Sequence, residues 1–269
     1  MGMARVARLA LLARLLGLMV VVSLQRELAH RANLAFEGAL ALVNAGAGAA
    51  ALLIVFAHVP TLAGWRVGEA LTLLGAYQIV SGLLQAFIEP NLAWFGGKVM
   101  RGEMDDVLLQ PAPSLLTVSL GSCEPFALLQ AALGALIIIA GVAHMDTVPT
   151  VGGAFASGAL LLAGVVITWA SRVLLASLAF WAPSIELDVF YGALWQLGRY
   201  PVGVYPPVIG WLLTYVIPVA FVATIPARTL ARGADPSLLA AGGIAALVAV
   251  LIVLLVWRAG LRRYTSATS

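Results

Sequence analysis

The chain has 269 residues, of which 62% are hydrophobic and only 10% are charged, and its net charge is +3. A soluble globular domain carries roughly a quarter charged residues, so this composition excludes a protein that faces water over most of its surface. It indicates an all-α integral membrane protein, and the basic groove with interleaved aromatic residues that nucleic-acid binding would need is missing.

Several windows of about 20 residues contain no charged side chain. At about 1.5 Å of rise per residue, a helix of that length crosses a hydrocarbon core of about 30 Å. The clearest windows are residues 38–57, 70–88, 125–143, 151–171 and 238–257. With a shorter crossing at 184–200, the sequence predicts six transmembrane helices in a single transmembrane domain that covers residues 1–269.

The N-terminal segment, residues 1–33, places basic residues before an apolar run and so resembles a signal peptide. Arg14 interrupts the run and no small-residue cleavage site follows it. We therefore expect an interfacial helix on the inner leaflet. With the N-terminus inside, ten basic residues fall on the cytoplasmic side and four outside, in agreement with the positive-inside tendency. Residues 258–269 then form a basic cytoplasmic tail.

The first three crossings are expected at residues 34–57, 68–88 and 115–143. The second ends at Glu89-Pro90, because a proline lacks the backbone donor that would continue the helix. The third is longer than a bilayer requires. Its first turns, with Cys123 and Glu124, should therefore project into the cytoplasm.

Charge gathers in the segment 90–114, between the second and third crossings. The nine positions 98–106 hold five charged side chains, which are Lys98, Arg101, Glu103, Asp105 and Asp106. A cytoplasmic loop permits such charge, and a merely solvated loop is the simplest interpretation. A segment that docks another protein is the alternative.

Arg172 lies within the fourth crossing, which is expected to run from about residue 151 to Trp181. An arginine inside a membrane costs several kcal/mol unless it snorkels, pairs or faces water. Glu186 and Asp188, early on the following helix, are the expected partners. A structural ion pair and a role in the substrate path both remain open.

Residues 201–230 carry prolines at positions 201, 206, 207, 218 and 226. Each proline removes a backbone donor, and a broken helix survives in lipid only where protein or water satisfies the freed groups. We expect a re-entrant hairpin that dips in from the outside. A plain kinked crossing is the alternative, and the sixth crossing follows at about 238–257.

No catalytic constellation is evident. The stretch GGKV at residues 96–99 lacks the earlier glycine and the Ser or Thr of a nucleotide-binding loop. His30, His58 and His144 lie in separate segments, and the single cysteine, Cys123, permits neither a disulfide nor a cysteine cluster. The chain is therefore not expected to be an enzyme or to hold a cofactor or metal.

Two stretches resemble the permease subunits of type-2 ABC exporters, in the bacterial branch that pairs two similar permeases with a separate ATPase. RGEMDDVLLQPAPS, which begins at Arg101, is similar to the cytoplasmic coupling pattern of that branch, with Gly102 and Pro111 at the expected spacing. The proline-studded stretch from Tyr200 to Gly233 is similar to its outer hairpin. The paired acids Asp105 and Asp106 depart from the pattern, in which a single acid is expected.

This resemblance implies that an ATPase holds the coupling segment in a cleft and moves it as ATP, with Mg, is bound and hydrolysed on the ATPase. The implied coupling residues are Lys98, Arg101, Gly102, Glu103, Asp105, Asp106, Leu108, Leu109 and Pro111. The hairpin would form the outer gate, through Pro201, Tyr205, Pro206, Pro218 and Pro226.

The resemblance further implies two ATPase subunits, a second permease chain that is identical or a similar paralogue, and a location in the bacterial cytoplasmic membrane. The substrate would be lipophilic or amphipathic, drug-like or lipid-like. An ion-coupled secondary transporter and a membrane enzyme or assembly scaffold are the alternatives. The first usually needs ionisable groups near the midplane, where Arg172 is the only candidate.

Overall fold

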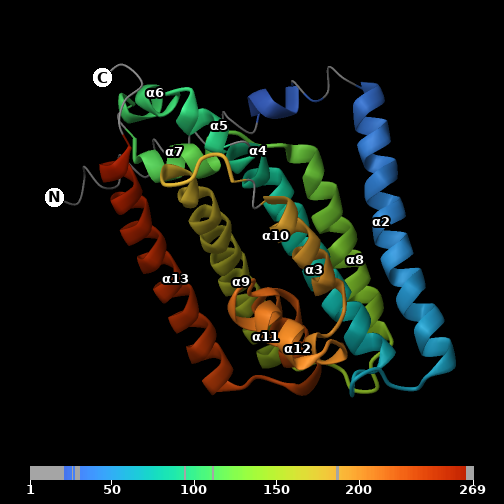
Figure 1. Cartoon of the computed structure of the whole chain (residues 1–269). Coiled ribbons are helices and arrows are strands. Elements are labelled where there is room, and N and C mark those ends of the chain that lie inside the picture. Colours follow the sequence, from blue (N-terminus) through green and yellow to red (C-terminus); the bar gives the residue numbers. More distant parts are fainter. Residues whose placement is uncertain are drawn as a thin grey trace, which may run out of the picture.

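The computed structural model describes residues 21–25, 27, 31–93, 95–110, 112–185 and 188–264, and it is all-helical with no strands in these ranges. Five helices are long and apolar enough to cross a membrane (Figure 1). They are α2 (Arg31–His58), α3 (Val67–Phe87), α8 (Leu128–Ala143), α9 (Val151–Ser177) and α13 (Pro236–Arg263). The charge-free windows of the sequence coincide with these helices, so five of the six expected crossings are confirmed as long apolar helices.

Helix α3 lies at the centre of the bundle. Within its most apolar window 78% of the residues are buried, against 11% for α13 and 17% for α2. The outer helices expose leucine, isoleucine and valine side chains, as expected for surfaces that meet lipid tails.

Glycines allow α3 and α8 to pack backbone against backbone. Gly68, Gly75 and Gly82 recur every seven residues on α3. Gly68 faces Gly141 and Gly75 faces Gly134 on α8, and Gly82 faces Ala131. A Cβ atom built at Gly134 would lie 2.7 Å from the Gly75 carbonyl oxygen. Small residues therefore hold the two helices together by close packing, since lipid offers no hydrophobic drive for association.

Replacing Gly134 with alanine is expected to destabilise the bundle by about 1–3 kcal/mol, because the backbone of α3 cannot yield to the new methyl group. The thermal unfolding temperature of the detergent-solubilised chain measures this loss. Gly46→Ala is the matched control, since nothing lies within 4 Å of a Cβ at Gly46. Equal unfolding temperatures for the two variants would contradict the packing argument.

The expected third crossing is wrong in its first part. The structure divides residues 115–143 into α7 (Ser114–Leu120), a short 3-10 turn η1 (Pro125–Ala127) and α8. Pro125 cannot donate a helical hydrogen bond, and the Asn91 side chain holds the break. Asn91 Nδ2 donates to the Ser122 carbonyl at 2.7 Å, while its Oδ1 accepts from the Ser122 backbone N–H, also at 2.7 Å.

The expected fifth crossing at 184–200 is also shorter than predicted. The described helix α10 is Asp188–Trp195, and the 3-10 turn η3 (Gln196–Arg199) follows it. Eight helical residues rise only about 12 Å, less than half a hydrocarbon core. The polar first turn and the glycine at 198 leave too little continuous helix for a full crossing.

The proline-rich segment folds as two short helical arms. It contains η4 (Val202–Val204), α11 (Pro207–Tyr215), a π-helical turn η5 (Ala220–Thr224) and α12 (Ile225–Arg232). The two arms are bent by 77°, and Pro218 lies at the break. By length and composition they amount to a broken span or a re-entrant loop.

Both ends of this segment lie beside the loop that joins α2 to α3. A Cβ at Gly203 would be 3.6 Å from the Cβ of Ala63, and Arg232 Nη2 donates to the Gly64 carbonyl at 3.2 Å. In between, Val219 and Phe221 contact Gly198 and Gly164 in the interior. The two ends of the segment therefore lie near the same loop, while its middle packs inside the bundle.

The expected N-terminal interfacial helix lies mostly outside the described residues. Residues 21–25 and 27 are helical, and Glu27 accepts a hydrogen bond from the Phe126 backbone N–H at 3.0 Å. The part of the tail beyond residue 264 also lies outside the described range.

Candidate functional site

The charged segment between α3 and α7 forms three short helices. They are α4 (Glu89–Leu92), α5 (Phe95–Met100) and α6 (Met104–Leu108). They gather at one end of the bundle, with α7 and the C-terminal end of α13 (Figure 1). Gly102 has a φ of 75° in the turn between α5 and α6, a left-handed conformation that glycine adopts without strain.

Charged side chains line the turn between α5 and α6. Arg101 donates to Glu103, and this guanidinium holds the pKa of the Glu103 carboxyl below its ordinary value. Lys98 Nζ donates to the Asn91 carbonyl at 3.4 Å. Asp106 is exposed, and Pro111 lies outside the described residues.

The same short helices present apolar side chains to the outside of the bundle. Leu109 is 85% exposed, Met100 60% and Leu108 46%. Met104 and Phe95, by contrast, are almost fully buried and hold the segment against the bundle. We call the exposed side chains of Met100, Asp106, Leu108 and Leu109 the α5–α6 surface. Exposed apolar side chains that are grouped and rimmed by polar residues mark sites of contact with proteins or membranes.

Four aromatic side chains, which we call the aromatic cluster, join this segment to α9 and α13. Phe95 packs edge-to-face on Phe180, with ring centroids 5.5 Å apart, and lies 5.7 Å from Trp257. Phe180, in the 3-10 turn η2 (Leu178–Phe180), also packs on Tyr264 at 6.4 Å. Gly260 makes room for the Phe180 ring, which a Cβ would meet at 2.2 Å.

Polar contacts reinforce this junction. Trp257 Nε1 donates to Ser114 Oγ at 3.2 Å, which ties α13 to α7. Burial and the nearby Asp105 carboxylate raise the pKa of Tyr264. The cluster was not predictable from the sequence, because four aromatic residues spread over 170 positions carry no local signal that they meet.

Arg172 on α9 is buried and lies between two carboxylates. Its Nη1 is 3.2 Å from Asp188 Oδ1, and its Nη2 is 3.6 Å from Glu89 Oε1. The Tyr191 ring covers the guanidinium, whose carbon lies 4.7 Å from the ring centroid. Glu186, the other expected partner, lies outside the described residues. Glu89, the first residue of α4, is a partner that was not predicted from the sequence.

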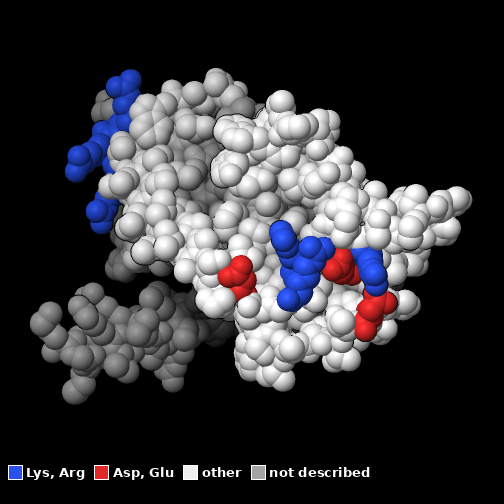
Figure 2. Space-filling model, turned by 90° about the horizontal axis from the view of Figure 1, so that it is seen from below, with Lys and Arg blue, Asp and Glu red and all other residues white. Residues whose placement is uncertain are grey.

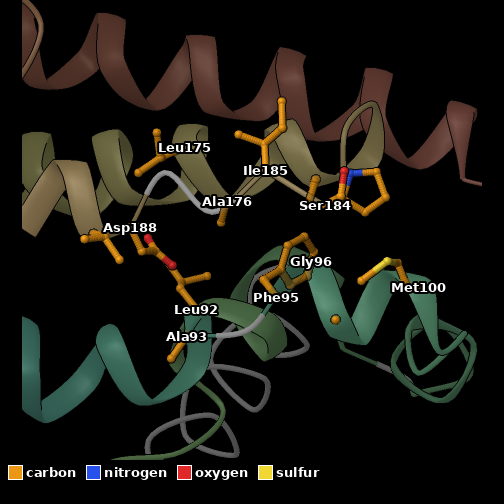
Figure 3. A pocket seen from close by; sticks show the side chains of 14 residues that line it. Leu92, Ala93, Phe95, Gly96, Met100, Leu175, Ala176, Ser184, Ile185 and Asp188 are labelled. Atoms are coloured by element: carbon orange, nitrogen blue, oxygen red, sulfur yellow. The ribbon is translucent and has the colours of Figure 1, made fainter.

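A cavity of about 570 Å³ lies between α5, η2 and the start of α10. Figure 3 shows Leu92, Ala93 and Phe95 on one wall and Leu175, Ala176 and Ile185 on the opposite wall. Asp188 is at one end of the cavity and Met100 at the other. Its lining is therefore apolar with a carboxylate at one end.

The opposite end of the bundle carries a group of ion pairs. Arg66 pairs with Asp146, and Arg232 Nε lies 3.3 Å from Glu69 Oε1. Figure 2 shows basic and acidic side chains grouped on this end within a mostly uncharged face. The Arg232–Glu69 pair connects the end of α12 to the start of α3, and the Arg66–Asp146 pair connects the start of α3 to the loop between α8 and α9.

Of the prolines and tyrosine expected at the gate, Pro206 precedes α11, and Pro226 lies in the first turn of α12. Tyr205 Oη donates to the Leu197 carbonyl at 2.8 Å, and Pro201 is buried ahead of η4. The five residues lie in or beside the short helices of the segment 201–232. In the described ranges, no group of three or more His, Cys, Asp or Glu residues could hold a metal.

Comparison with known proteins identifies one family. The model of the family described as "ABC-2 family transporter protein" matches residues 42–268, which is most of the chain. No curated protein and no solved structure gives a significant match.

Proposed function

We propose that this chain, which belongs to the ABC-2 transporter family as a permease subunit, exports a lipophilic or amphipathic substrate with energy from a partner ATPase. The observation that carries this proposal is the α5–α6 surface. It exposes Leu109 almost completely, three residues after the exposed Asp106, in short helices that lie outside the candidate membrane spans. Such a surface fits a shallow cleft on a soluble ATPase.

In the proposed mechanism, the aromatic cluster transmits the movement of the ATPase to the transmembrane helices. Movement of α5 displaces Phe95, which packs on Phe180 at the end of α9 and on Trp257 of α13. Aromatic packing of this kind transmits displacement because protein interiors are close-packed and resist compression. The hairpin of α11 and α12 would act as the outer gate.

The proposed working unit contains two ATPase subunits, which bind ATP and Mg, and a second permease chain, identical or a similar paralogue. The unit would sit in the bacterial cytoplasmic membrane with both termini of this chain in the cytoplasm. This orientation puts the α5–α6 surface on the side where ATP is found.

Purification of the tagged chain from its native membrane in mild detergent tests the proposal. We expect a subunit with a nucleotide-binding motif to co-purify, together with vanadate-sensitive ATP hydrolysis. Reconstituted vesicles should accumulate substrate only when ATP is supplied. Transport driven by a proton gradient alone, with no ATPase present, would instead favour an ion-coupled transporter, for which Arg172 and its two carboxylates are the supporting observation.

The hairpin makes a separate prediction about sidedness. In a Cys123→Ala background, single cysteines that replace Gly203 or Arg232 should both react with a membrane-impermeant maleimide added outside intact cells. The reason is that both positions lie beside the same loop. A cysteine that replaces Leu109 is the control and should react only after the cells are opened. Labelling of Gly203 and Arg232 from opposite sides would mean that the segment crosses.

A further inference from the structure

We propose that the cavity between α5, η2 and the start of α10 binds a small amphiphilic cation, whose charge pairs with Asp188. This inference rests on the proposed function, because it names the class of substrate and a place where that substrate binds. A volume of about 570 Å³ lies within the range of roughly 300–1,000 Å³ that is usual for small-molecule sites.

The shape of the cavity determines the orientation in which such a ligand would bind. Aliphatic and aromatic side chains form both long walls, and the Asp188 carboxylate stands at one end (Figure 3). An amphiphile would therefore lay its apolar part along Phe95 and Ala176 toward Met100. Its charged group would come to rest beside Asp188.

The local charge balance selects a cation. Arg172 faces two carboxylates, Asp188 and Glu89, so this group of three carries one excess negative charge. The Arg172 side chain is only 7% exposed and is covered by the Tyr191 ring, whereas Asp188 is 48% exposed. At the Met100 end, Arg101 is paired with Glu103. A bound anion would thus find no unpaired cation in the described lining, while a cation meets an accessible carboxylate.

One wall of the cavity belongs to the α5–α6 segment. Gly96 of α5 lies so close to the loop before α10 that a Cβ would be 2.4 Å from the Pro183 carbonyl oxygen. Any displacement of α5 by an ATPase therefore changes the width of the cavity. The same wall would contact the bound substrate and move with the ATPase, which links substrate release to ATP hydrolysis.

Two ions of nearly the same shape and opposite charge test the inference. Tetraphenylphosphonium and tetraphenylborate would each be titrated into the full chain in zwitterionic nanodiscs, with empty nanodiscs subtracted. We expect saturable binding of tetraphenylphosphonium and none of tetraphenylborate. Saturable binding of both ions with similar affinity, or of the anion alone, would overturn the inference.

Two substitutions locate the bound cation. Asp188→Asn should weaken tetraphenylphosphonium binding about three- to fivefold, as expected for one half-exposed ion pair. Ala176→Phe, which fills the cavity and leaves the charges unchanged, should weaken it by about tenfold or more. The matched controls are Asp146→Asn, in an ion pair at the other end, and Ala159→Phe, on the exposed face of α9.

Gel filtration must first show that each variant is folded. If Asp188→Asn fails this check, two results still test the inference. They are the comparison of tetraphenylphosphonium with tetraphenylborate in the wild-type chain and the binding of tetraphenylphosphonium to Ala176→Phe. Unchanged binding in Ala176→Phe would overturn the inference. These titrations use no ATP, so lost cation binding with intact ATP-driven transport refutes this site alone. Intact cation binding without ATP-driven transport refutes only the proposed function.

Discussion

Leu109→Asp is expected to lower the affinity of the permease for its ATPase by roughly tenfold or more, the size of an interface hot spot. Leu109 is 85% exposed at the end of α6, so its apolar side chain is available to fill a pocket on a partner. A carboxylate there would have to be desolvated on docking. Co-purified ATPase and ATP-driven transport should fall together, while insertion and folding of the permease stay normal.

Val148→Asp is the matched control for this experiment. Val148 is 92% exposed, in the loop between α8 and α9 at the opposite end of the bundle, so the same change of chemistry there should leave the ATPase in place. Normal ATPase retention and transport by Leu109→Asp would refute docking at the α5–α6 surface.

Asp106→Lys provides a second probe of the same surface. Among the three acids of the segment, Glu103 pairs with Arg101 and Asp105 lies against Tyr264, so reversing either would also disturb contacts within the chain. Asp106 is exposed, and reversing its charge tests the partner more directly. We expect weaker coupling, with a smaller effect than that of Leu109→Asp, because rim charges contribute less than apolar anchors.

Arg172→Met is expected to destabilise the folded chain by about 2–3 kcal/mol. The substitution keeps most of the side-chain volume but leaves Asp188 and Glu89 beside each other without the guanidinium that balances them. The loss of one partner of a buried pair typically costs about 3–5 kcal/mol, and the half-exposed carboxylates place this case at or below the lower limit. The unfolding temperature in detergent reports the change.

A rescue variant separates the lost charge from lost packing. Adding Asp188→Asn to Arg172→Met should restore part of the stability, since the two carboxylates no longer repel. Arg66→Met is the control. Its ion pair with Asp146 is largely exposed, so the effect should stay within about 0.5 kcal/mol. If Arg172→Met were no more harmful than Arg66→Met, the buried cluster would have no structural role.

Composition and hydropathy alone predicted much of the fold. A charge-free window of about 20 residues has few alternatives to a spanning helix, because lipid leaves every backbone donor and acceptor to be satisfied within the segment. The five long helices could therefore be predicted from the sequence. The shortening of the crossings expected at 115–143 and 184–200 could not, since a helix break depends on distant partners. Asn91, for example, lies 31 residues before Ser122, to which it is hydrogen-bonded.

The residues of the candidate site likewise fall into those that could be predicted from the sequence and those that could not. Its charged and proline-rich segments stand out locally, so residues such as Asp106 and Pro218 could be singled out without coordinates. Glu89 could not be assigned to Arg172, which lies 83 positions later. The expected partner Asp188 was close in sequence and therefore easier to identify.

By itself the sequence determined that this protein spans a membrane, where its charges gather and where prolines interrupt the segment 201–230, because these follow from local hydropathy and backbone chemistry. Only the tertiary structure decided that Phe95, Phe180, Trp257 and Tyr264 meet, that Leu109 is exposed and that Asp188 closes an apolar cavity. Those features depend on how helices distant in the chain pack, and packing is set by many small contacts that no single stretch of sequence contains.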